Sequence, residues 1–299
     1  SLDVRQVSTV HEKIFEALAE SQKNLLPDYN KLNEDEKINM LVKLTGTVNS
    51  EIFTDPVHKD TLNTIQAIRF IQVQNGEAGC NRYIISHCRN ALNIMEVYAL
   101  FLLGGWKKEA INIDIVPLFE SIEDLQNAAG IMEKLFTNPV YIEHLKRLGN
   151  KQTIMLGFSD GTKDGGYLMG NWSIYRAKEE LTKVSRKYGI RAIFFDGRGG
   201  PPARGGGKTH KFYASMGKNI SNINIELTVQ GQTVSSNFGT IDAAQFNMEQ
   251  LLNAGISNDL FAPDNVTFDE SEEKLMTELS QAGYQAYQVL RDHPYLTDY

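Results

Sequence analysis

The chain has 299 residues, with 30 lysines and arginines against 37 aspartates and glutamates, and its formal net charge is −7. This length allows one large or two small domains with a hydrophobic core, and a hydrophobic content of 41% is that of a globular protein. The negative charge argues against a general affinity for nucleic acid, because a negative surface repels phosphate backbones.

No segment predicts a membrane or secretory protein. The most apolar run, residues 97–103, is far shorter than the roughly 20 residues of a membrane-spanning helix. Residues 1–5 do not resemble the start of a signal peptide, so the chain is expected to be cytoplasmic. Cys80 and Cys88 lack the Cys-x-x-Cys spacing, which predicts two reduced thiols rather than a zinc site or a disulfide framework.

The first 78 residues are predicted to be helical. Val7, Val10, Ile14 and Leu18 recur at intervals of three and four, which is the spacing of one helix face. Two further amphipathic helices are predicted at about residues 34–44 and 58–74.

From about residue 82 the pattern changes to strands that alternate with helices. Short β-branched runs occur at residues 83–85, 111–116, 153–158 and 190–195. Helices are predicted between them at residues 91–103, 122–135 and 167–188, the last ending at Gly189. This alternation predicts βαβ units and a parallel sheet. The near-continuous apolar strands indicate burial on both faces, as in a barrel or a doubly wound sheet.

Strict alternation at residues 223–229 predicts one more strand, with a polar face. Two helices, at about residues 243–252 and 270–290, are predicted to complete the chain.

Charged side chains follow two of the predicted strands. In α/β barrels the working residues lie at the C-terminal ends of the strands. Glu120 follows one strand, and Asp160 and Lys163 follow the next. Two carboxylates on different strands suit Mg²⁺ or Mn²⁺ bound jointly with a substrate oxygen. A single acid after a strand more often caps a helix, but two acids beside Lys163 and an arginine-rich loop favour a site.

The arginine-rich loop, residues 197–210, contains six glycines and three cations, Arg198, Arg204 and Lys208. Glycine lets backbone amides close on an anion, and arginine recognises phosphate or carboxylate through two parallel hydrogen bonds. A flexible, solvated loop is the alternative. Cations held close together by glycines are costly without a neutralising anion, so the loop predicts an anion-binding site.

Two other functions remain open. Gly207-Lys208-Thr209 matches the end of a nucleotide-binding P-loop, which would make the protein a P-loop ATPase. The first glycine of that motif falls on Pro202, and no strand leads directly into the loop, so the match is weak. A non-catalytic scaffold with the same fold is the second alternative.

Five segments together resemble phosphoenolpyruvate carboxylase. They run in register along nearly the whole chain, at residues 2–6, 116–125, 155–165, 197–207 and 228–232. The resemblance implies part of a TIM-type (β/α)8 barrel with many additional α-helices. It divides the chain into a helical segment at 1–78, a barrel portion with the active-site loops at 79–239 and a helical segment at 240–299.

The resemblance further implies that phosphoenolpyruvate is carboxylated by bicarbonate to oxaloacetate and phosphate, in a cytoplasmic homotetramer that requires Mg²⁺ or Mn²⁺. It makes Glu120 and Asp160 the metal ligands, and Lys163, Arg198 and Arg204 the catalytic residues. The residues that it implies for substrate binding are Arg5, Arg198, Gly199, Gly200 and Arg204. No nucleic acid or membrane is expected as a partner.

Two departures from the family pattern stand out. Asp196 occupies the position before Gly-Arg-Gly-Gly where the family commonly has histidine, and no role is assigned to it. Family members are several times longer, and the family's Thr-Ala-His-Pro-like histidine motif does not occur here. The chain is therefore expected to be a fragment of a longer enzyme, with Ser1 a tag remnant. The fragment alone is expected to be inactive.

Overall fold

The structure is a computed structural model that describes residues 3–199, 207–217, 219–221, 223–229, 231–261 and 268–295. The chain divides into two compact units. The first comprises Ser1–Leu118 and Gly130–Thr153, and the second comprises Phe119–Ala129 and Ile154–Tyr299. The boundary between the units therefore runs through two neighbouring strands, β3 (Asp114–Phe119) and β4 (Lys151–Leu156).

The strands are hydrogen-bonded in chain order from β1 to β6. The other four are β1 (Asp3–Val7), β2 (Arg82–Ser86), β5 (Arg191–Gly199) and β6 (Ile225–Val229). The pairings β1–β2, β2–β3 and β5–β6 are parallel. Parallel neighbours need a crossover connection, and helices provide it, which confirms the predicted βαβ units.

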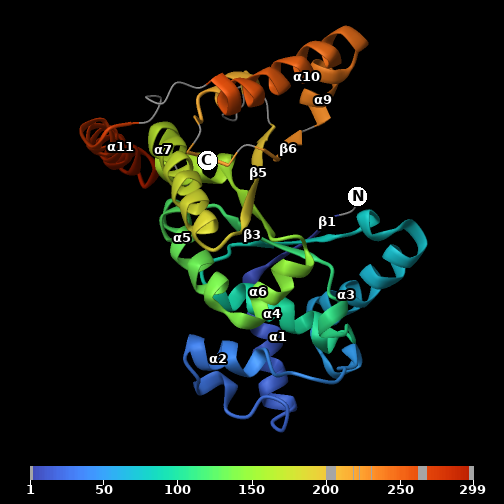
Figure 1. The fold of residues 1–299 in the computed structure, drawn as a ribbon. Coiled ribbons are helices and arrows are strands. Elements are labelled where there is room, and N and C mark those ends of the chain that lie inside the picture. Colours follow the sequence, from blue (N-terminus) through green and yellow to red (C-terminus); the bar gives the residue numbers. More distant parts are fainter. Residues whose placement is uncertain are drawn as a thin grey trace. The chain divides into compact units, whose positions relative to one another are not determined.

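Helices make up most of the described chain (Figure 1). They are α1 (Ser8–Ser21), α2 (Glu34–Leu41), α3 (Pro56–Asn75), α4 (Ala91–Leu103), α5 (Ile122–Thr137), α6 (Pro139–Arg147), α7 (Phe158–Lys187), α8 (Thr209–Ala214), α9 (Gly231–Phe238), α10 (Ile241–Ile256) and α11 (Glu270–Arg291). No helix of the described residues is long and apolar enough to span a membrane.

The core of the first unit is built around α4, whose 13 residues are all buried. The ring of Phe101 on this helix meets Tyr83 of β2 edge-on at 5.9 Å and Trp106 at 5.4 Å. Cys80 and Cys88 are buried in the same unit and are not joined by a disulfide, as predicted. Apart from Asn93 and Glu96, which are also buried, α4 is apolar on nearly every side, and such a helix belongs in a protein interior.

The prediction of a purely helical N-terminal region is wrong at its start. Residues Asp3–Val7 form β1, where Arg5 lies opposite Ile84 of β2. Val7, predicted to begin the first helix face, is the extended N-cap of α1. The cause is tertiary, because β1 is held by a strand far along the chain, and helical spacing within the segment carries no record of that pairing.

The segment after β4 also differs from its prediction. The helix expected from residue 167 begins at Phe158, so Asp160 and Lys163 lie in its first turns. Gly166 interrupts α7 with a φ of +75°, and the Tyr287 ring of α11 packs against it, so a Cβ there would lie 3.1 Å from Tyr287 Cγ. The cluster of glycines hides this first helical piece from a periodicity search. The predicted end is confirmed, since Gly189 follows α7 with a φ of +68°.

Candidate functional site

The site in the second unit is built where β3, β4 and β5 end. The amide of Gly157, after β4, donates to the carbonyl of Phe119 at 2.9 Å. A Cβ on Gly157 would lie 3.2 Å from Cγ of Glu120, and one on Gly197 would lie 3.1 Å from the Leu156 carbonyl oxygen. Glycine at these two positions therefore permits the close approach of neighbouring strand ends.

The start of α5 is capped by two other acids. Asp124 accepts a hydrogen bond from the Ser121 amide at 3.1 Å, and Asp164 accepts one from the Ile122 amide at 2.9 Å. Glu120, just before this helix, is only 6% exposed. The capping role considered for the acids after the strands is thus performed by Asp124 and Asp164.

Asp160 and Lys163 form an ion pair in the first turns of α7, with Nζ 3.2 Å from Oδ1. Both side chains are mostly exposed, at 54% and 74%, so the pair contributes little to folding stability. An acid in the first turn of a helix also interacts favourably with the helix dipole. The Asp160 carboxylate is therefore accessible to a ligand.

Helix α11, which lies beside α7 (Figure 1), holds the backbone of this segment in place. The Tyr287 hydroxyl donates to the Lys163 carbonyl oxygen at 2.8 Å. Arg291 donates to the carbonyl oxygen of Asp164 at 2.6 Å and to its carboxylate at 3.1 Å. Asp164 thus connects α11 with the start of α5.

Arg198 lies on β5 where the register with β6 shifts, between Asp196 and Gly199. Irregularities of this kind re-aim side chains at strand ends. The guanidinium carbon lies 4.2 Å from the centroid of the Phe212 ring and 5.8 Å from that of Phe158. Its Nε and Nη1 atoms are buried without a hydrogen-bond partner among the described residues.

The charge of Arg198 makes this arrangement informative. Burial lowers the pKa of Arg198, but an arginine stays protonated in proteins. Two buried donors on a permanent cation are costly when they are left unsatisfied. The site therefore suits an anion, such as a phosphate or a carboxylate, whose oxygens accept hydrogen bonds from the guanidinium group.

A buried ion pair that the sequence did not predict lies beside Arg198. Lys178 of α7 places Nζ 2.6 Å from Oδ2 of Asp196, and the two side chains are 2% and 0% exposed. The Tyr213 hydroxyl donates to the same oxygen at 2.8 Å. One feature of the sequence could have indicated this pair. Lys178 lies on the same helix face as Ile174 and Leu181, which are both buried, and that face is otherwise uncharged.

The remaining predicted site residues lie elsewhere in the chain or outside its described part. Arg5 is exposed on β1 in the first unit, and Gly199 is the last residue of β5. Gly200 and Arg204 lie outside the described residues. Lys208 is exposed and is the N-cap of α8.

The residues that could hold a metal are two carboxylates. Among the residues that the structure describes, no group of three or more His, Cys, Asp or Glu side chains could bind a metal ion. Glu120 is buried at the end of β3, and Asp160 is exposed at the start of α7. Magnesium is commonly bound by one or two carboxylates together with waters and substrate oxygens, so this donor set fits such an ion.

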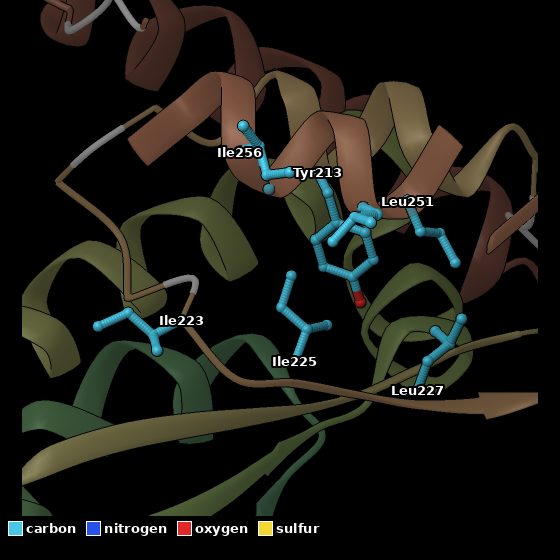
Figure 2. Close-up of a pocket in the computed structure, with 8 residues that line it drawn as sticks. Tyr213, Ile223, Ile225, Leu227, Leu251 and Ile256 are labelled. Atoms are coloured by element: carbon cyan, nitrogen blue, oxygen red, sulfur yellow. The ribbon is translucent and has the colours of Figure 1, made fainter. Parts of the chain in front are cut away.

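An apolar cavity of about 410 Å³ lies behind the ion pair, between β6 and α10 (Figure 2). Tyr213 lines it together with Ile225 and Leu227 of β6 and Leu251 of α10. The described residues of the lining include no charged side chain, so these residues do not form the anion site.

These features define the class of protein: an α/β protein of parallel βαβ units, with a candidate anion site and two carboxylates at its strand ends. A family model described as phosphoenolpyruvate carboxylase matches residues 1–299. The chain belongs to the phosphoenolpyruvate carboxylase family.

Relatives named phosphoenolpyruvate carboxylase show how much of such a protein the chain corresponds to. The one from Mycobacterium avium (strain 104) is 32% identical, over 100% of this chain and 33% of the relative. The one from Nitrosomonas eutropha is 33% identical, over 97% of this chain and 32% of the relative. The chain thus spans about a third of the length of these relatives.

Proposed function

We propose that this chain provides the phosphate-binding and metal-binding part of an enzyme that carboxylates phosphoenolpyruvate with bicarbonate, yielding oxaloacetate and inorganic phosphate. The observation that carries the proposal is Arg198, whose Nε and Nη1 are buried without a partner among the described residues. A phosphate group supplies charged acceptor oxygens for donors of this kind. In this proposal the six strands belong to a (β/α)8 barrel.

Arg198 would hold the phosphate of the substrate and stabilise its charge as it passes to bicarbonate. The face of Phe212 at 4.2 Å fixes the plane of the guanidinium group, so that the donors are oriented before the ligand arrives. Gly199 and Gly200 would add backbone amides.

Glu120 and Asp160 would bind Mg²⁺ or Mn²⁺. When bound, the cation would offset negative charge on the substrate. Glu120 is buried against the Gly157 turn, which makes it the rigid ligand, whereas the exposed Asp160 can adjust its position. Lys163, paired with Asp160 at 3.2 Å, would place a positive charge beside the reacting groups, and Arg204 would hold bicarbonate.

Binding of phosphoenolpyruvate to this chain, measured by calorimetry with and without Mn²⁺, tests the proposal. We expect Arg198→Gln to abolish binding. Arg191→Gln should leave it unchanged, because Arg191 is exposed at the far end of the same strand. We also expect Mn²⁺ to bind weakly and to be lost in Glu120→Gln.

A coupled assay for oxaloacetate tests the second part of the proposal. No turnover is expected from this chain alone, because the histidine motif implied for catalysis does not occur in its sequence. Oxaloacetate formation by the purified chain would contradict that expectation. The absence of any phosphoenolpyruvate binding would overturn the proposed function itself.

A further inference from the structure

The buried pair of Lys178 and Asp196 has no place in the site described so far, yet it adjoins Arg198. We propose that Lys178 is a positioning residue of the anion site, which neutralises Asp196 so that the charge of Arg198 stays directed at the bound phosphate. This inference rests on the proposed function and adds a residue to the same site.

The Lys178–Asp196 pair is deeply buried. Nζ of Lys178 is 2.6 Å from Asp196 Oδ2 and lies 5.1 Å from the ring centroid of Phe194 and 5.2 Å from that of Phe212. Burial lowers the pKa of Lys178, and the neighbouring Asp196 carboxylate opposes this shift. A buried ion pair contributes little net stability compared with apolar residues of the same size, so stability alone is a weak explanation for its presence.

The charges of Asp196, Lys178 and Arg198 lie close enough to act on one another. Asp196 precedes Arg198 by two positions on β5, and its carboxylate acts on the charge of Arg198. The Lys178 ammonium group lies near the rings of Phe212 and Tyr213. The Phe212 ring also contacts the guanidinium group of Arg198. Two cations and one carboxylate leave one positive charge, which suits an anionic ligand.

Apolar side chains lie behind the pair. The Tyr213 hydroxyl is committed to Asp196, while its ring lines the apolar cavity (Figure 2). Ile225 lines both this cavity and the small space around Lys178 and Asp196. Charges in such surroundings interact more strongly than in water, so the pairing of Asp196 affects Arg198 directly.

Removal of Lys178 should therefore change the partner of Asp196. The unpaired carboxylate would attract Arg198, the neighbouring cation, and would compete with the phosphate for it. Removal of Asp196 should have the opposite effect, because Arg198 then loses a nearby negative charge. A purely structural role predicts weaker binding in both cases.

Calorimetric titration of this chain with inorganic phosphate separates these outcomes. We expect Lys178→Gln to weaken binding about tenfold, and Asp196→Asn to leave it equal or tighter. The double variant should return to within about threefold of the wild type, because it removes both charges. Lys183→Gln, at an exposed position of the same helix, is the matched control.

Each result is decisive. Unchanged binding in Lys178→Gln would overturn the inference and leave the proposed function standing, whereas no phosphate binding by the wild type would overturn both. Circular dichroism identifies a variant that fails to fold. If Lys178→Gln does not fold, the phosphate affinity of Asp196→Asn is the test. Weaker binding in that variant would contradict the inference, and equal or tighter binding would support it.

Discussion

The guanidinium carbon of Arg198 lies 4.2 Å from the centroid of the Phe212 ring, which makes the ring of α8 a platform for the cation of β5. Phe212 is itself held edge-on by Phe158, at 5.4 Å between centroids. The orientation of the anion site thus depends on an aromatic contact between residues of three elements.

Phe212→Leu should weaken phosphate binding about threefold to tenfold, because a cation–π contact contributes about 0.5–2 kcal/mol and the guanidinium loses its fixed plane. Phe212→Tyr keeps the ring and should bind like the wild type. Calorimetry with inorganic phosphate is the measurement. Equal affinity in the leucine and tyrosine variants would show that the ring does not orient Arg198.

Gly157→Ala should destabilise the protein by about 1–3 kcal/mol and weaken Mn²⁺ binding, because the added Cβ would meet Glu120 Cγ at 3.2 Å. Gly130→Ala is the matched control, since nothing lies within 4 Å of its Cβ position inside α5. It should be neutral or stabilising by up to about 1 kcal/mol. Chemical denaturation and a manganese titration check both variants. Wild-type stability and Mn²⁺ affinity in Gly157→Ala would contradict the close approach of Gly157 to Glu120.

Arg291→Met should loosen the packing of α11 on the first turns of α7, because it removes the hydrogen bonds to the Asp164 carbonyl oxygen and carboxylate. Hydrogen exchange should become faster in α11 and around residues 160–165. Lys274→Met is the control on the same helix, where the ion pair with Glu278 is exposed and 3.9 Å long. Equal hydrogen-exchange rates in the two variants would show that Arg291 does not hold α11 against α7.

Glu96 of α4 should make the first unit less stable as the pH rises. Burial raises the pKa of Glu96 to about 8 from the ordinary 4.5, and the charge of Glu12 adds to this shift. Between these values the folded state holds a proton that the unfolded state has lost, so the free energy of unfolding falls as pH increases. The total effect is on the order of 4 kcal/mol.

Glu96→Gln should remove most of this slope, because glutamine cannot lose a proton and can still accept the hydrogen bond from the Tyr29 hydroxyl. Exposed Glu20→Gln should retain the wild-type slope. Urea denaturation at several pH values from 5 to 9 is the measurement. A slope that persists in Glu96→Gln would assign the effect to another group.

Much of the fold could be predicted from the sequence because its signals are local. Alternating apolar runs and amphipathic helices indicated the βαβ units, and Gly189 marked the end of α7. The same reasoning selected Glu120 and Asp160 as side chains that follow strands, and Arg198 as part of a basic, glycine-rich segment; in the structure Arg198 lies on β5 itself. Their roles as ligands remain proposals.

What the sequence determined by itself is the strands β2 to β6, the helices α4, α5, α10 and α11, the later part of α7, and the residue types at the strand ends, because periodicity, glycines and charges are properties of neighbouring residues. The short helices α6, α8 and α9 were not predicted. Only the tertiary structure decided that Asp3–Val7 is a strand and that Lys178 is the partner of Asp196. Both depend on which distant segments meet when apolar surface is buried, and that choice minimises the free energy of the whole packed chain rather than of any one segment.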